Sequence, residues 1–134
     1  MLSKNIEQLL QDQVKKEASS SQTYLAMACW ADTKGFEGAV SFLYAHSDEE
    51  RQHMLKLIKF LNERGCQATV PALEAPKKDF SSLMEVFKSI LEHEIVVTAS
   101  INSIITACLQ ENDHLTNNFM QWYISEQMEE EELA

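Results

Sequence analysis

The sequence has few residues that interrupt helices. Its 134 residues include three glycines and two prolines. All five fall between long stretches of helix-compatible composition, at Gly35, Gly38, Gly65, Pro71 and Pro76. Because glycine and proline mark helix ends, this distribution predicts four long helices. No alternating pattern typical of strands competes with them.

Positive charge and cysteine are also scarce. Eleven lysines and arginines stand against 21 aspartates and glutamates, which gives a formal net charge of −10. This balance argues against a nucleic-acid partner and suits a protein that attracts cations. The three cysteines, Cys29, Cys66 and Cys108, are odd in number and lack metal-ligand spacing. We therefore expect reduced thiols rather than a disulfide framework, and the sequence assigns the cysteines no role.

Long apolar runs and a secretion signal are missing as well. No apolar run approaches the roughly 20 residues that span a membrane. The N-terminus lacks the charged-then-apolar pattern of a signal peptide. Hydrophobic residues still make up 45% of the chain, which is enough to build a core. We expect a single domain over residues 1–134 that is soluble and cytoplasmic and has no membrane partner.

The expected helices lie between these breakers. They run roughly over Ser3 to Lys34, Gly38 to Arg64, Ser82 to Gln110 and Asp113 to the end of the chain. Capping signals support these boundaries. The signals are Gly35 and Gly65 as C-terminal caps, Ser82 with Glu85 as a capping box, and Asn112 or Asp113 as the cap of the last helix.

The lengths of the connections between helices indicate the topology of the bundle. The first and third connections are only a few residues long, so each joins an antiparallel pair. The second connection, residues 65–81, has 17 residues and reaches ~55 Å when extended. A helix of 27 residues is only ~40 Å long, so this connection can cross the whole bundle. The predicted fold class is all-α, a four-helix bundle with one long crossover between parallel second and third helices.

Each helix has an apolar stripe in steps of three and four that is interrupted by hydrophilic residues near its middle. The interrupting residues are Glu17, Glu50 with His53, Glu94, and Gln127 with Glu130. The midpoints of neighbouring helices coincide whether they run parallel or antiparallel, so these groups should meet at one depth. Buried carboxylates without partners are costly. The pattern therefore predicts a bound cation, and the number of ligands predicts a two-metal site.

These residues resemble the ferritin-like di-iron family, in which two helices give single glutamates and two give Glu-x-x-His. Glu17 and Glu94 match the single glutamates, and Glu50-Arg51-Gln52-His53 matches one Glu-x-x-His. The fourth helix has Gln127-Met128-Glu129-Glu130 without a second histidine, which resembles bacterial non-haem ferritin. The resemblance covers the whole chain. It is closest over residues 35–53 (GFEGAVSFLYAHSDEERQH) and 119–132 (FMQWYISEQMEEEE).

The resemblance implies a ferroxidase that oxidises Fe(II) with O2 inside one subunit and passes Fe(III) to a mineral in a protein cage. Carboxylates with one imidazole suit iron that cycles to the ferric state, and such a site also accepts manganese or zinc. We expect Glu17, Glu50 and His53 to hold the first iron. Glu50 would bridge to a second iron held by Glu94 and Glu130.

Other side chains are expected around this centre. Gln127 would be a neutral neighbour that contacts bound oxygen or, weakly, the second iron. The resemblance implies that Tyr24 is hydrogen-bonded beside the site, although its spacing equally fits a core residue. His46, one turn from Glu50, is expected to orient a ligand or face the cavity rather than to be a primary ligand. Trp122 is most simply a packing residue.

Three further glutamates, Glu49, Glu126 and Glu129, are each one residue from an expected ligand. Each is therefore turned ~100° around its helix. Spacing alone leaves open a solvated face. The resemblance favours a third iron site, completed by Glu130, on the route to the cavity.

Three alternatives remain. A DNA-protecting mini-ferritin needs ligands across a subunit interface and often a basic tail, whereas this chain has its ligands within one bundle. A metal-free structural bundle does not explain the central carboxylates. A haem-binding bacterioferritin is disfavoured because Arg51 follows Glu50, where that family has its haem-ligating methionine. We therefore expect no haem.

The resemblance also bears on the end of the chain. The family has a short fifth helix that lines the four-fold pores of a twenty-four-subunit shell, and that helix is missing from this sequence. A fourth helix as long as the others would have Gln127 at its middle and continue past Ala134. We therefore expect a C-terminally truncated chain that stores iron in a cage. The alternative is a truncated bundle that binds iron without assembling a complete cage.

Overall fold

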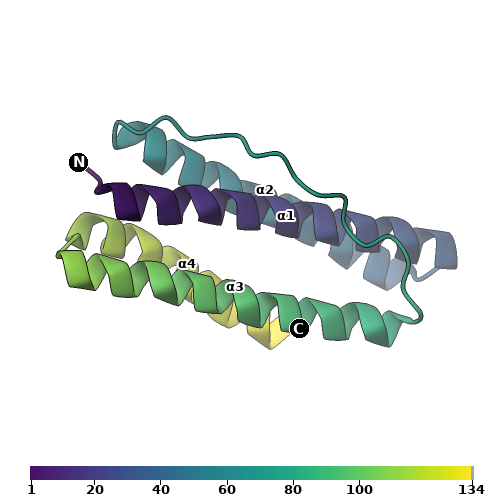
Figure 1. The fold of residues 1–134 in the computed structure, drawn as a ribbon. Helices are drawn as coiled ribbons and strands as arrows, with labels where there is room; N and C mark the ends of the chain where they lie inside the picture. The colour runs from purple at the N-terminus through teal and green to yellow at the C-terminus, as the bar shows by residue number, and fades with distance from the viewer. Residues whose placement is uncertain (134) are drawn as a thin grey trace.

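Four long helices make up most of the chain in the computed structural model, which describes residues 1–133 (Figure 1). They are α1 (Lys4–Lys34), α2 (Glu37–Glu63), α3 (Leu83–Glu111) and α4 (His114–Leu133). Residues 1–133 contain no strand. The four expected helices are confirmed, and their described ends differ from the predicted ends by at most one residue. Ala134, the last residue of the expected domain and of the last apolar stripe, lies outside the described residues.

A polar side chain begins α1, and a glycine with positive φ lies at the end of α1 and just past the end of α2. The Ser3 hydroxyl accepts a hydrogen bond from the backbone N–H of Ile6 and begins α1. Gly35 ends α1 with φ at +77°, a conformation that glycine adopts without strain. Gly65 also has a positive φ of +83°. The cap of α2 is nevertheless Arg64, so the expectation for Gly65 was wrong by one residue.

Polar residues cap both ends of α3 and the start of α4. The Ser82 hydroxyl accepts from the backbone N–H of Glu85, as a capping box requires. The Glu85 carboxylate binds the residue before Ser82, so the box is not fully reciprocal. Asn112 ends α3 in the left-handed region with φ at +57°. Asp113 caps α4 by accepting from the backbone N–H of Thr116.

The long connection between α2 and α3 runs back along the outside of the bundle, as Figure 1 shows. The pairs α1–α2 and α3–α4 are antiparallel hairpins, whereas α2 and α3 point in the same direction. This arrangement confirms the predicted crossover. In Figure 1, α4 ends well before it reaches the far end of the bundle.

Two apolar clusters divide the core into halves. One cluster is centred on Leu10, Leu57 and Ile101, and the other includes Met27 and Leu43. Along each of α1, α2 and α3 the hydrophilic interruption lies between residues of the two clusters. The buried polar groups therefore form a layer with apolar packing on both sides, which keeps water away from them.

The third helix is the most apolar. By length and composition it is the one helix within residues 1–133 that could cross a membrane, with a mean hydropathy of 1.2 over its most apolar window. A core helix of a soluble protein passes the same test, so this is weak evidence. Part of the apolar surface faces outward in the single chain, at Leu91, Ile95, Val96 and Leu109. We call these four residues the α3 apolar surface.

Replacement of Leu57 tests the packing of the larger cluster. Leu57 is fully buried, so we expect Leu57→Ala to lower the free energy of unfolding by ~2–5 kcal/mol through lost burial and a cavity. Urea unfolding of the metal-free protein measures this change. Leu115, which is 63% exposed, provides the control, because Leu115→Ala should change stability by less than about 0.5 kcal/mol. Equal losses in the two variants would contradict this description of the core.

Candidate metal centre

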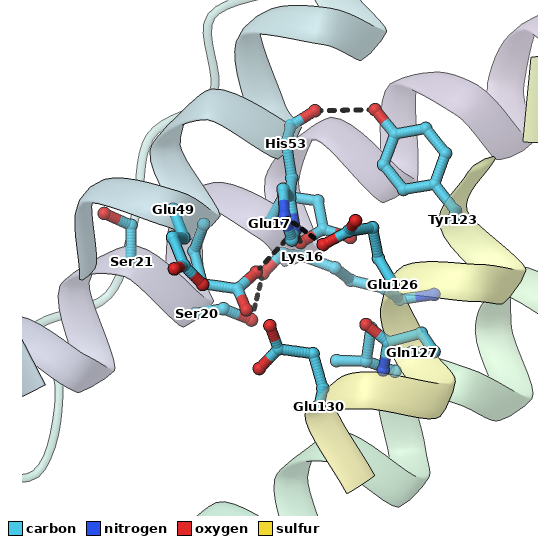
Figure 2. Close-up of polar contacts among 12 residues, drawn as sticks. Lys16, Glu17, Ser20, Ser21, Glu49, His53, Tyr123, Glu126, Gln127 and Glu130 are labelled. Carbon is cyan, nitrogen blue, oxygen red and sulfur yellow. Dashed lines mark hydrogen bonds and ion pairs between the residues drawn. The ribbon is translucent and has the colours of Figure 1, made fainter. Parts of the chain in front are cut away.

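All four helices contribute a hydrophilic side chain to the buried polar layer. None of the six expected ligands exceeds 3% exposure. They are Glu17 on α1, Glu50 and His53 on α2, Glu94 on α3, and Gln127 and Glu130 on α4. The helix periodicity brings them there because each replaces an apolar residue on the core-facing stripe of its helix. Figure 2 shows the α4 side chains extending toward those of α1 and α2.

Glu17, Glu50 and His53 form a first group that could hold a cation. One potential ligand atom from each lies within 4.8 Å of the others. The His53 Nδ1 atom is 3.3 Å from Glu50 Oε2 and 3.8 Å from Glu17 Oε2. Three buried atoms of this group have no hydrogen-bond partner among residues 1–133, namely Glu17 Oε2, Glu50 Oε1 and His53 Nδ1. Unpartnered buried polar atoms are rare, so their convergence indicates a place for a ligand.

A second group consists of His46, Glu50 and Glu130, again with ligand atoms within 4.8 Å of one another. His46 Nε2 is in direct contact with Glu130 Oε2. Both groups include Glu50, so this carboxylate lies between two positions for a cation. His46 is more closely involved than its spacing in the sequence suggested.

Glu94 belongs to neither group because other side chains engage both of its oxygens. Tyr24 donates its hydroxyl to Glu94 Oε1 at 2.6 Å, and Gln127 donates its amide N–H to Glu94 Oε2 at 3.0 Å. The same amide lies 3.1 Å from the Thr98 hydroxyl oxygen. The tyrosine is therefore hydrogen-bonded within the polar layer, as the family resemblance implied.

Two side chains beside the first group were missed in the sequence analysis. Gln13 is 1% exposed and donates to Glu17 Oε1 at 3.1 Å. The Ser100 hydroxyl on α3 approaches Gln13 Oε1 at 2.9 Å. Gln13 precedes Glu17 by four residues and therefore lies on the same face of α1. That spacing was the available signal, whereas the proximity of Ser100 depends on how α1 and α3 pack.

Burial and mutual contact shift the pKa values of the first group. Burial raises the pKa of the Glu50 carboxyl to about 10, and its neighbour Glu17 adds to the rise. Burial alone would lower the pKa of His53, but Glu17 and Glu50 outweigh it and raise that pKa to about 10. Burial opposes ionisation of Glu17, yet the proximity of His53 and Glu50 holds its pKa below the usual value. At neutral pH the group therefore carries protons on Glu50 and His53.

His46 and Glu94 also retain protons more firmly than exposed side chains of the same kind. Burial lowers the pKa of His46, but hydrogen bonding and attraction to Glu130 raise it above its usual value. Burial raises the pKa of Glu94, and the hydrogen bonds from Tyr24 and Gln127 only partly offset this. Burial, together with the neighbouring Glu94, also raises the pKa of Tyr24. Tyr24 therefore stays protonated and remains a hydrogen-bond donor.

The three glutamates expected at a third site lie at the outer edge of the polar layer. Glu126 is partly buried, with Oε2 3.7 Å from His53 Nε2, so it approaches the ring nitrogen that faces away from the first group. Glu49 is exposed, with Oε2 4.0 Å from His46 Nδ1. Glu129 is also exposed. Neither of the two groups described above includes these glutamates.

Two aromatic residues of α4, Trp122 and Tyr123, contact His53. The Tyr123 hydroxyl donates to the backbone carbonyl of His53 at 2.7 Å. The Trp122 ring meets the His53 ring edge-on, with centroids 5.1 Å apart. These contacts restrict the orientation of His53, and the Lys56 amino group covers the Trp122 ring at 4.5 Å. Trp122 therefore packs against a candidate ligand rather than in the apolar core.

The donor atoms fit a hard or borderline divalent cation. They are carboxylate oxygens and imidazole nitrogens without thiolates, which suits iron, manganese or zinc in a labile site. The three unpartnered atoms of the first group would gain the contact that they lack. Binding also requires the loss of the protons on Glu50 and His53.

Comparison with known protein families and curated sequences gives a consistent assignment. The family model described as ferritin-like domain matches residues 7–134. The chain is 47% identical over 133 residues to a probable bacterial non-heme ferritin-like protein of Haemophilus influenzae, covering 99% of this chain and 81% of that protein. It is 42% identical over 133 residues to a bacterial non-heme ferritin of Campylobacter jejuni, covering 99% and 80%.

Solved structures share the same fold. A ferritin of Chlorobium tepidum superimposes with a TM-score of 0.97 at 39% identity, covering 99% of this chain and 81% of that chain. An open pore ferritin of Archaeoglobus fulgidus superimposes with a TM-score of 0.95 at 34% identity, covering 98% and 81%. The family match, the sequence relatives and the solved structures agree with the four-helix arrangement of buried carboxylates. The chain therefore belongs to the ferritin-like family and is related to the bacterial non-haem ferritins.

Proposed function

We propose that this protein is an iron-storage ferritin that oxidises Fe(II) with O2 at a two-iron site within each subunit. The observation that carries the proposal is the convergence of unpartnered, buried donor atoms from Glu17, Glu50 and His53. The relatives named as ferritins support iron as the cargo. Two ferrous ions held side by side can each supply one electron to dioxygen. The ferric product would then pass to a mineral in the cytoplasm.

The proposed ligand set places the first iron between Glu17, Glu50 and His53. Glu50 would bridge to a second iron, because it also belongs to the group with His46 and Glu130. Glu94 would complete the second iron by exchanging one of its present hydrogen bonds for the ion. The donor that remains, Tyr24 or Gln127, would then hold Glu94 in place.

A third iron position is proposed at Glu49, Glu126 and Glu129 together with Glu130. The raised pKa of Glu126, caused first by burial, indicates that this carboxyl lies in a partly water-excluded environment. Glu126 adjoins His53, and Glu49 adjoins His46. The acidic edge would therefore receive ions that leave the two buried positions.

Self-association is proposed from the surface of the subunit. The α3 apolar surface leaves side chains such as Val96, 63% exposed, in contact with water in the single chain. Exposed apolar side chains of this kind are found at contacts with other proteins. The relatives named as ferritins support a hollow cage.

Loss of ligands should abolish iron oxidation. We expect Glu50→Ala and Glu94→Ala to reduce the initial rate of oxygen consumption with Fe(II) at least about a hundredfold, since even partners of metal ligands alter activity by 10–100-fold. Glu92→Ala is a matched control, because Glu92 is exposed and only two residues from Glu94. Wild-type rates of oxygen consumption in both ligand variants would contradict the site assignment and favour a metal-free bundle.

The protons on Glu50 and His53 predict how cation affinity depends on pH. Both pKa values are raised to about 10, so both groups are protonated at neutral pH and a cation must displace their protons. Affinity should therefore rise with pH, by up to about ten-fold per unit for each displaced proton. Calorimetric titration with Zn²⁺ at about pH 6, about pH 7 and about pH 8 measures the slope. An affinity that does not change across this range would contradict the protonation scheme.

The mass of the assembly decides between storage and a non-assembling bundle. We expect a solution mass about twenty-four times the 15.3 kDa of the chain, because the family resemblance implies a closed, symmetric twenty-four-subunit shell. Light scattering coupled to size-exclusion chromatography measures it. Val96→Asp should shift the distribution toward smaller species if the α3 apolar surface is part of an interface. A monomeric or dimeric wild type would contradict storage in a cage. Only the proposed ferroxidase activity would then remain.

A further inference from the structure

The hydrogen bonds in the polar layer treat its three central carboxylates differently. Glu94 has a donor on each oxygen, from Tyr24 and Gln127. Glu17 has one on Oε1 and none on Oε2. Glu50 Oε1 has no hydrogen-bond partner, and its Oε2 faces the His53 ring. The number of oxygens still available to a cation therefore differs from one glutamate to the next.

The single donor to Glu17 comes from Gln13, one turn away on the same helix. Gln13 is buried and uses both ends of its amide. Its Nε2 lies 3.1 Å from Glu17 Oε1, and its Oε1 lies 2.9 Å from the hydroxyl oxygen of Ser100. Because the two ends of an amide differ, a rotated Gln13 would place its oxygen against the Glu17 carboxylate, where the two would repel.

Ser100, on α3, stabilises this orientation of the Gln13 amide. Its hydroxyl lies between Gln13 Oε1 and the Val97 carbonyl at 2.7 Å, so its hydrogen is shared between two acceptors. Whichever of these two acceptors the Ser100 hydroxyl favours, the Gln13 oxygen faces α3 and the Gln13 N–H faces Glu17. The contact thereby couples the packing of α1 on α3 to the position of a candidate ligand.

We propose that Gln13, oriented by Ser100, is a positioning residue that restricts Glu17 to binding the first cation through Oε2 alone. The proposal rests on the two-iron site proposed above. Oε1 is occupied by the Gln13 amide, whereas the unpartnered Oε2 lies 3.8 Å from His53 Nδ1, on the side of the first group. A carboxylate held in this way binds through one oxygen. It leaves room at the ion for dioxygen or water and holds the product less tightly than a carboxylate that binds through both oxygens.

A purely structural role for Gln13 makes a different prediction. In that case Gln13 only satisfies its own polar atoms between α1 and α3, and its replacement would alter stability without changing the cation site. An apolar residue of similar size in place of a buried polar network can even be neutral for stability. Cation affinity and the mode of Glu17 binding therefore separate the two roles, whereas the melting temperature alone does not.

The test combines two substitutions at this contact with two matched controls. Gln13→Leu removes the amide, and Ser100→Ala removes only the hydroxyl that orients it. Gln8→Leu is a control for the first, because Gln8 donates to Asp12 with the same spacing on the exposed face of α1. Ser103→Ala is a control for the second, because Ser103 is exposed and bonds only to the Ala99 carbonyl of its own helix.

Calorimetric titration of each metal-free protein with Zn²⁺ alone gives the first readout. We expect Gln13→Leu and Ser100→Ala to change the affinity of the tighter binding step about ten-fold, upward where the freed Glu17 binds through both oxygens and downward where it is displaced. The two controls should match the wild type. A crystal structure of each protein soaked in Zn²⁺ gives the second readout. Glu17 should bind through one oxygen in the wild type and through both oxygens, or in a displaced position, in Gln13→Leu.

The outcomes separate this inference from the proposed function. Glu17→Ala is included in the same titrations, and an unchanged tighter step in that variant would overturn the two-iron site and this inference with it. Loss of that step in Glu17→Ala, together with wild-type affinity and one-oxygen binding in Gln13→Leu and Ser100→Ala, would overturn the inference alone. Ser100→Ala changes one partly buried hydroxyl, so it remains informative even if Gln13→Leu does not fold.

Discussion

The burial of carboxyl groups in the middle of an apolar bundle is the constraint on which the rest of this structure depends. One glutamate from each helix lies in a layer with apolar clusters on both sides. Isolated charges there would be strongly destabilising. The protein meets this constraint in three ways: by protons retained on Glu50 and His53, by amide and hydroxyl donors to Glu17 and Glu94, and by direct contact of His46 with Glu130.

These three means of stabilisation also prepare the layer for cations. The protons on Glu50 and His53 are the positive charges that a bound cation would replace. The donors to Glu17 and Glu94 keep those carboxylates in fixed orientations while leaving different numbers of oxygens available. Glu50, shared by both groups, is the carboxylate with most freedom to contact two ions. Acidic residues at the outer edge, such as Glu126 beside His53, continue the negative potential toward the surface.

Most of the fold could be predicted because its signals are local or depend on chain length. Capping by Gly35 and Ser82, the periodic stripes and the 17-residue connection were sufficient for the helices and their directions. The error was also local, because Gly65 follows the cap of α2 rather than forming it. Of the two residues expected to cap α4, Asp113 forms the cap, and Asn112 ends α3.

The sequence by itself determined which residues are buried at one depth, because helical periodicity assigns a face and the connections assign a direction to each helix. Only the tertiary structure decided which atoms of those residues meet. The side chains of His46 and Glu130 make contact, the Glu94 oxygens turn to Tyr24 and Gln127, and Ser100 reaches Gln13. These contacts join residues far apart in sequence, and they depend on the rotation and offset of packed helices. A one-dimensional pattern specifies the face of a helix but not its offset against a neighbour.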